Sequence, residues 1–238
     1  RYRITGNIQV KPFVTLRGDW QDPDTGNAYG TIILADVPSS EEDLPALFTL
    51  GGSGGVYGLT VYYPGQSESA VKPYPYTFYV PGEAGGLGYY MLPSITNCTV
   101  INGYKGITTP AGTAVHEMLT VENLKGTFLY AAANVYNQAD VGTWKTIRIS
   151  NDYWANAGAG LRPAYRPTLD AYTRANATGL ILGDLEWGQF ADIQISDVNI
   201  GVRIVEGRRI QFAGSFYDLT VTNANVGFQV DAVDPRWG

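Results

Sequence analysis

The sequence predicts an all-β protein, a right-handed parallel β-helix in which short strands stack coil upon coil. Three observations favour this fold. Short apolar-x-apolar strands recur along the chain, an Asn or Asp stands two residues after most of them, and their spacing falls in the twenties. A repeat of that length, built from β-branched strands, is typical of a β-solenoid. The 29 glycines and 13 prolines among 238 residues argue against a helical bundle.

The corner residues after the strands carry the repeat. Asn and Asp tolerate a left-handed backbone and bond to their own chain, so we expect them to stack along one edge of the rod. Glycine follows three or four residues later, where we expect it to permit a second bend. The corner residues are Asn102, Asn123, Asn151, Asp197 and Asn223, and the glycines are Gly106, Gly126, Gly201 and Gly227.

Spacing decides between the repeat architectures. Ile149 and Ile195 lie 46 residues apart, which we interpret as two coils of 23. Some ten coils of about 4.8 Å each would form a rod of roughly 45 Å. Leucine-rich repeats share the period, but no coil shows a convincing helical stretch. A β-sandwich would not place one corner residue after every strand.

Composition excludes several classes of protein. The net charge of -6, from 16 basic and 22 acidic residues, argues against nucleic-acid or anionic-membrane partners. No apolar stretch is long enough to span a membrane, and a single cysteine allows no internal disulfide. Because residue 1 already begins a predicted strand and 234–238 form a predicted turn, we expect 1–238 to be one β-helix domain, incomplete at both ends. The remaining coils of a longer parent chain would then be its partner.

Two segments resemble a known superfamily. The runs Lys-Pro-Phe-Val-Thr-Leu-Arg-Gly at 11–18 and Gly-Gly-Val-Tyr-Gly-Leu-Thr-Val at 54–61 resemble an early coil of pectate-lyase-like proteins, in the branch related to family-28 glycosyl hydrolases. The resemblance implies a right-handed parallel β-helix and a carbohydrate ligand. The polygalacturonase motifs Asn-Thr-Asp, Asp-Asp and Gly-His-Gly are absent, and Arg209-Ile210 is followed by Gln211. That active site is therefore not carried over, and no lyase set of Arg base and calcium carboxylates is identified.

Aromatic residues gather where the repeat breaks, at 62–90 and 152–178. Insertions in solenoids collect on one face and often bind ligands, and flat aromatic rings pack on sugars. The alternative is that the long loops fold back and use aromatics to cover the core. The candidate substrate-binding residues are Tyr74, Tyr76, Tyr153, Trp154 and Trp187.

Candidate catalytic acids lie in and near the run 182–187. If this run is a strand, Asp184 and Glu186 share a face, roughly 6–7 Å apart. Glycoside hydrolysis uses carboxylate pairs about 5–5.5 Å apart for retention or about 6.5–9.5 Å for inversion. Asp152 and Asp170 are the alternative acids, and a solvated acidic strand face is the alternative interpretation.

The remaining signals are weaker. Asp22 and Asp24 have the cadence of a calcium loop, but the distal bidentate Glu is missing and such a run is more often a plain turn; no other cofactor is predicted. Cys98 occupies an inward strand position and should be a buried apolar residue. His116 has no Ser or Cys partner suggested by the sequence, so we expect it to be structural or on the surface.

Three functions remain open at this point. The first is a glycoside hydrolase acting on an extracellular polysaccharide or oligosaccharide, in a secreted or cell-surface protein. The second is a non-catalytic carbohydrate-binding or adhesin module, and the third is a polysaccharide lyase. Acid pairs with aromatics in a groove would favour the first, and the absence of convergent carboxylates would favour the second. A basic residue facing bound calcium would favour the third.

Overall fold

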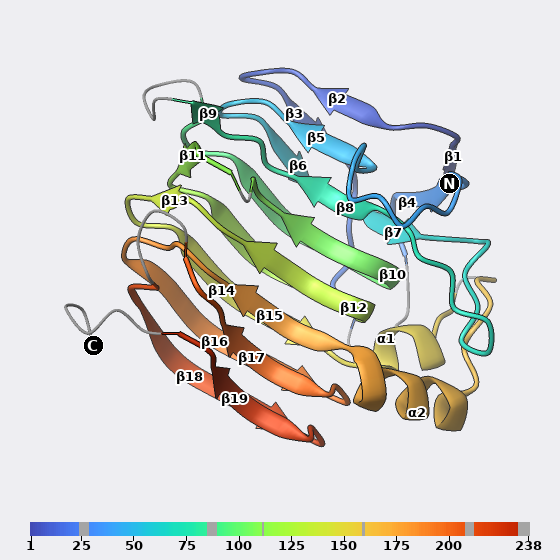
Figure 1. Ribbon diagram of the computed structural model, residues 1–238. Coiled ribbons are helices and arrows are strands. Elements are labelled where there is room, and N and C mark those ends of the chain that lie inside the picture. Colours follow the sequence, from blue (N-terminus) through green and yellow to red (C-terminus); the bar gives the residue numbers. More distant parts are fainter. Residues whose placement is uncertain (24–28, 85–89, 111, 159, 208–211, 233–238) are drawn as a thin grey trace.

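The predicted all-β parallel β-helix is confirmed by a computed structural model (Figure 1). It describes residues 1–23, 29–84, 90–110, 112–158, 160–207 and 212–232. The strands form three faces, which the chain visits in the same order in each coil. None of the helices in these ranges has both the length and the apolar character needed to cross a membrane.

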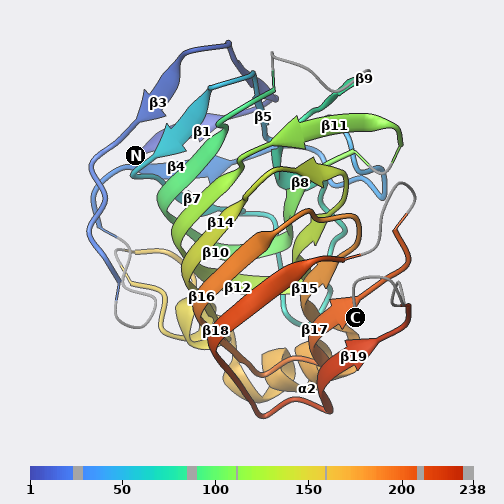
Figure 2. The ribbon, with the colours of Figure 1, turned by 90° about the vertical axis from the view of Figure 1, so that its left-hand side faces the viewer.

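The first face consists of eight strands within the described ranges, each parallel to the next. Eight strands correspond to eight coils, two fewer than the spacing suggested. Figure 2 shows this face next to the second. The strands are β1 (Tyr2–Ile4), β4 (Ile32–Ala35), β7 (Thr60–Tyr62), β10 (Ser94–Thr108), β12 (Thr120–Val135), β14 (Thr143–Ile149), β16 (Gly188–Ser196) and β18 (Gly214–Thr222).

The other two faces use the same long strands, because β10 and β12 bend through the corners and continue from the third face to the second. The second face joins β10 and β12 to β2 (Ile8–Val10), β5 (Phe48–Leu50), β8 (Tyr76–Tyr79), β15 (Thr178–Leu182), β17 (Ile200–Ile204) and β19 (Val226–Val230). The third face joins β3 (Thr15–Arg17) and β6 (Gly55–Tyr57) to the first parts of β10, β12, β14, β16 and β18. A small sheet of β9 (Glu83–Ala84), β11 (Ala114–Glu117) and β13 (Gln138–Ala139) lies beside them.

The core consists of inward side chains stacked in register from coil to coil. Trp144, Phe190 and Phe216 are paired residues of β14, β16 and β18, and their rings stack with centroids 5.7 and 4.8 Å apart. Cys98 is fully buried in the same core, as its strand position predicts. Burial raises the pKa of its thiol to about 12, so it stays protonated at neutral pH. Stacking of like side chains fixes the register between coils.

The insertion after β14 changes the interpretation of the spacing. Ile149 pairs directly with Ile195, so the 46 residues between them form one long coil rather than two of 23. The extra residues hold α1 (Asp152–Ala155) and α2 (Arg166–Asn176), which lie together at one edge of the β-helix (Figure 1). The expectation of no convincing helix was wrong for this segment, because α2 packs the buried Leu169 and Thr173 against β12 rather than following the coil repeat.

The corner ladder is correct for four of its five residues. Asn102, Asn151, Asp197 and Asn223 each stand two residues after a stacked inward position, and the Asn223 amide donates to Asp197. Asn123 belongs to a different corner, because Gly126, not Val121, pairs with Val100.

Asn123 instead lies in a second ladder, where the third face turns into the first. Its residues share positive φ angles of 50–60°, and the Asn123 amide donates to Asn97 at 3.1 Å. Local backbone bonding by short polar side chains explains why such residues fill this bend. The ladder is Asn97 (54°), Asn123 (57°), Thr146 (56°), Asp192 (56°) and Asp218 (60°).

The corner glycines are needed for close approach between coils rather than for a left-handed bend. None of the four has a positive φ. A Cβ at Gly106 or Gly126 would collide with the carbonyl oxygen of the neighbouring coil, at Ala132 and Val100 respectively. A Cβ at Gly201 would collide in the same way with the carbonyl oxygen of Gly227 in the next coil. A Cβ at Gly227 itself would meet nothing within 4 Å.

Candidate functional site

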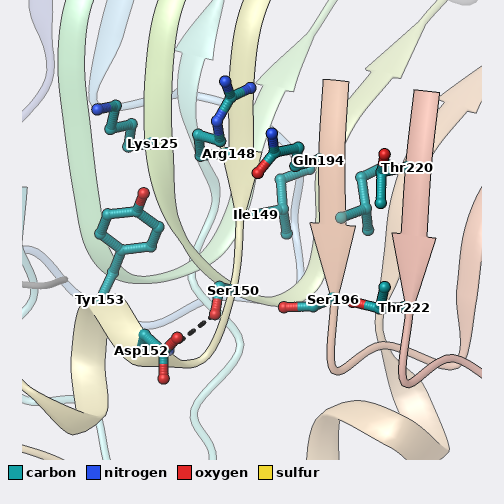
Figure 3. Close-up of a pocket in the computed structure, with 11 residues that line it drawn as sticks. Lys125, Arg148, Ile149, Ser150, Asp152, Tyr153, Gln194, Ser196, Thr220 and Thr222 are labelled. Atoms are coloured by element: carbon teal, nitrogen blue, oxygen red, sulfur yellow. Dashed lines mark hydrogen bonds between the residues drawn. The ribbon is translucent and has the colours of Figure 1, made fainter. Parts of the chain in front are cut away.

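A groove of about 490 Å³ lies on the outside of the first face. Its floor is a row of polar side chains from four neighbouring strands, which Figure 3 shows side by side. Lys125, Arg148, Gln194 and Thr220 are paired in register across β12, β14, β16 and β18. Neighbouring strands place such equivalent positions about 4.8 Å apart, so the row presents one polar group per coil.

A second row of hydroxyl groups runs beside the first, towards the helical insertion. Ser196 and Thr222 are a paired position on β16 and β18, and Ser150 directly follows β14. Beyond it, α1 brings Asp152 and Tyr153 to the edge of the groove (Figure 3). The Ser150 hydroxyl accepts a hydrogen bond from the backbone N–H of Asp152 at 3.1 Å, which fixes the start of this helix.

The cations of the groove are neutralised by neighbouring carboxylates. Both Asp192 oxygens accept hydrogen bonds from Arg148 Nη2 at 2.7 Å, and these bonds hold the pKa of Asp192 below its ordinary value. Lys125 forms an ion pair with Asp22, and its ammonium lies 5.9 Å from the ring centroid of Trp20. The floor is therefore polar but carries little net charge.

Arg166 of α2 binds the carboxylates next to the groove. Its Nε donates to Asp170 at 2.6 Å and its Nη2 donates to Asp197 at 2.9 Å, while Nη1 pairs with Asp152. Burial opposes the charged form of the guanidinium, but the hydrogen bonds from Arg166 to Asp170 and Asp152 raise its pKa above the ordinary value. The structure thus brings Asp152 and Asp170 to one place, as acids held by a permanent cation.

Asp184 and Glu186 do not share an open strand face. The run 183–187 is a corner between β15 and β16, where only Leu185 makes a bridge, to Gln138. Strand alternation fails there, so Asp184 is fully buried while Glu186 is half-buried. The interpretation of these two residues as paired acids in a groove was wrong on geometry.

Most of the predicted sugar-binding aromatics lie in the core. Trp154, Tyr74 and Tyr76 are at most 4% exposed, and Trp154 Nε1 donates to the Arg162 carbonyl at 3.1 Å. Their rings cover the apolar core, as expected if the long loops fold back onto the β-helix instead of binding a ligand. Tyr153 is also largely buried but borders the groove.

Of the remaining predicted residues that the structure describes, only Asp22 contacts a polar row of the groove, through its ion pair with Lys125. Trp187, with φ of 50°, is 58% exposed at its corner and does not line the groove. Asp22 is bound to Lys125, and Asp24 lies outside the described residues, so the calcium loop stays a prediction. Within the described ranges, no three acidic, Cys or His side chains come together as a metal site. His116 is fully buried on β11, opposite Gln138, in keeping with a structural role.

The groove residues were missed although a signal for them was present. Arg148, Gln194 and Thr220 are the middle positions of the apolar-x-apolar triplets that defined the repeat. Because residues alternate across a strand, the middle residue of each triplet must point outwards. Aligning the triplets by register would have placed these side chains in one row.

Comparison with known proteins adds no name to this site. No protein-family model matches the chain, and no curated protein matches it either. The resemblance of 11–18 and 54–61 to pectate-lyase-like proteins remains an expectation. The shape and the polar lining of the groove are therefore the basis for the function of this chain.

Proposed function

We propose that this chain is a non-catalytic carbohydrate-binding module that holds a polysaccharide in the groove of the first face. The observation that carries the proposal is the state of the acids: Asp152 and Asp170 are bound to Arg166, and Asp184 is buried. Convergent carboxylates available for proton transfer are the feature a glycoside hydrolase needs. The two polar rows of the groove contain no such pair of carboxylates, and they suit the binding of a sugar chain without its cleavage.

The chemistry of the floor suits a sugar chain. Hydroxyl and amide side chains both donate and accept hydrogen bonds, as sugar hydroxyls do. Gln194 and Ser196 of β16 and Thr220 of β18 offer these groups on two neighbouring strands. An extended chain lying across the strands would meet one polar side chain of the floor at each coil, about 4.8 Å further on. With a ligand of this kind, the proposed module would act outside the cell, as part of a secreted or cell-surface protein.

The two enzymatic alternatives have less support. A hydrolase would need two neighbouring carboxyl groups that face the substrate, whereas Asp152 and Asp170 both bind the Arg166 guanidinium. A lyase would need a free base beside a bound cation, whereas Arg148 is paired with Asp192 and Lys125 with Asp22.

Titration calorimetry with a panel of linear hexasaccharides of glucose, xylose, mannose, galactose and galacturonic acid tests the proposal. We expect at least one sugar to bind, and Gln194→Ala to weaken binding about tenfold by removing one or two hydrogen bonds. Gln189→Ala is the matched control, because Gln189 is exposed on the same strand, β16, but does not line the groove. Equal affinity of both variants and the unmodified chain would place binding outside the groove, and no binding of any sugar would overturn the proposal.

A further inference from the structure

A second depression, of about 390 Å³, is lined by tyrosines from three separate elements. Tyr104 of β10 and Tyr130 of β12 stack with ring centroids 5.6 Å apart and planes inclined by 30°. Tyr172 of α2 borders the same space, together with Glu41 and Lys105. Tyr130 is 40% exposed, so part of the aromatic surface is open to solvent. This depression shares no lining residue with the groove.

The contacts around Lys105 narrow the class of ligand. Its ammonium lies 5.3, 5.8 and 5.6 Å from the ring centroids of Tyr76, Tyr104 and Tyr130, and it pairs with Asp43. The cation-binding position of the aromatic cluster is thus already filled by the protein's own lysine. A cationic ligand is disfavoured there, and a purely apolar one would cover the exposed Glu41 carboxylate without offering it a hydrogen-bond donor.

A sugar ring combines the features that remain. One face of a pyranose is apolar and packs on an aromatic ring, while its edge carries hydroxyls for charged partners. The exposed Tyr130 ring provides the surface, and Glu41 provides an acceptor at the rim. We propose that Tyr104, Tyr130 and Tyr172 form a second carbohydrate subsite, separate from the groove. The class of ligand rests on the proposed function, but the site itself does not.

The same hexasaccharide panel tests this subsite by stoichiometry. We expect two binding events in the unmodified chain and one in Tyr130→Ala, with the groove event retained. Tyr130→Phe keeps the ring and should keep both events. Tyr217→Ala is the matched control, because Tyr217 is 59% exposed but lies outside the depression. Unchanged melting of Tyr130→Ala by circular dichroism would show that the fold is intact.

The outcomes separate this proposal from the proposed function. Binding that Gln194→Ala weakens and Tyr130→Ala leaves unchanged would overturn the second subsite and support the groove. Binding that only Tyr130→Ala removes would overturn the groove and support the subsite. If no sugar of the panel binds, both are overturned. If Tyr130→Ala unfolds the chain, Tyr130→Phe decides, because loss of one event with the ring still present would contradict stacking.

Discussion

Replacing Asn102 with Leu should strongly destabilise the β-helix. The Asn102 side chain is fully buried and bonds the backbone of the coil before it, accepting from Tyr63 N–H at 2.8 Å and donating to Tyr63 C=O at 3.0 Å. The Leu side chain has neither the acceptor nor the donor of Asn102, so the N–H and C=O of Tyr63 are left buried and unpaired. Each unpaired group costs about 1–3 kcal/mol of stability. Apolar burial of the Leu side chain offsets part of this cost. We expect a net loss of about 2–4 kcal/mol in the free energy of unfolding.

Urea denaturation followed by circular dichroism measures this loss, provided that the slope of the transition is unchanged. Asn225→Leu is the matched control, since Asn225 also makes two side-chain hydrogen bonds at a corner but is exposed to solvent. Water can replace its lost bonds, so we expect a change within about 0.5 kcal/mol. If Asn102→Leu costs no more than Asn225→Leu, the corner ladder does not stabilise the fold as argued.

Three further perturbations test two ion pairs of the insertion and one close contact between coils. Hydrogen bonds from Arg162 hold the pKa of Glu68 at about 2, below its ordinary 4.5, so this contribution to stability is complete above pH 4.5 and is lost as pH falls towards 2. Glu68→Gln should flatten that part of the stability profile, and unfolding midpoints measured from pH 6 to pH 2.5 check it. Arg166→Met should cost about 2–4 kcal/mol in denaturation experiments, because it leaves Asp197, with a side chain only 6% exposed, without its cation. Gly106→Ala should lower the melting temperature measured by calorimetry, because its Cβ would collide with the Ala132 carbonyl, and an unchanged value would contradict the close approach of these coils.

The fold was predictable because its strands carry their register in the sequence. Apolar-x-apolar triplets and corner amides recur wherever one coil stacks on another, and the pairs Ile149–Ile195 and Ile195–Val221 follow them. The error at Asn123 arose because two corners use the same residue types, one for the turn after the first face and one before it. Local residue type cannot tell the two corners apart, whereas pairing between strands can.

The site was less predictable, because it depends on contacts that no repeat encodes. Arg166 reaches three carboxylates only because α2 folds back against the β-helix, and nothing in the coil repeat sets that docking. Asp184 was expected to point outwards by strand alternation, but its segment is a corner, where alternation does not apply. Aromatic residues of the insertion could be found by composition, but whether Trp154 covers the core or faces solvent follows only from its tertiary contacts.

Simultaneous measurement of binding and cleavage tests the central claim most directly. The chain is incubated with insoluble cellulose, xylan, mannan, chitin or acid-precipitated pectate, the bound fraction is measured by co-sedimentation, and the supernatant is assayed for new reducing ends and unsaturated products. Binding in the groove without catalysis predicts retention on at least one polysaccharide, weakened by Gln194→Ala but not by Gln189→Ala, with no products over the no-protein control. Accumulation of reducing ends or unsaturated sugars that Gln194→Ala abolishes would show that the groove is an active site and contradict the account.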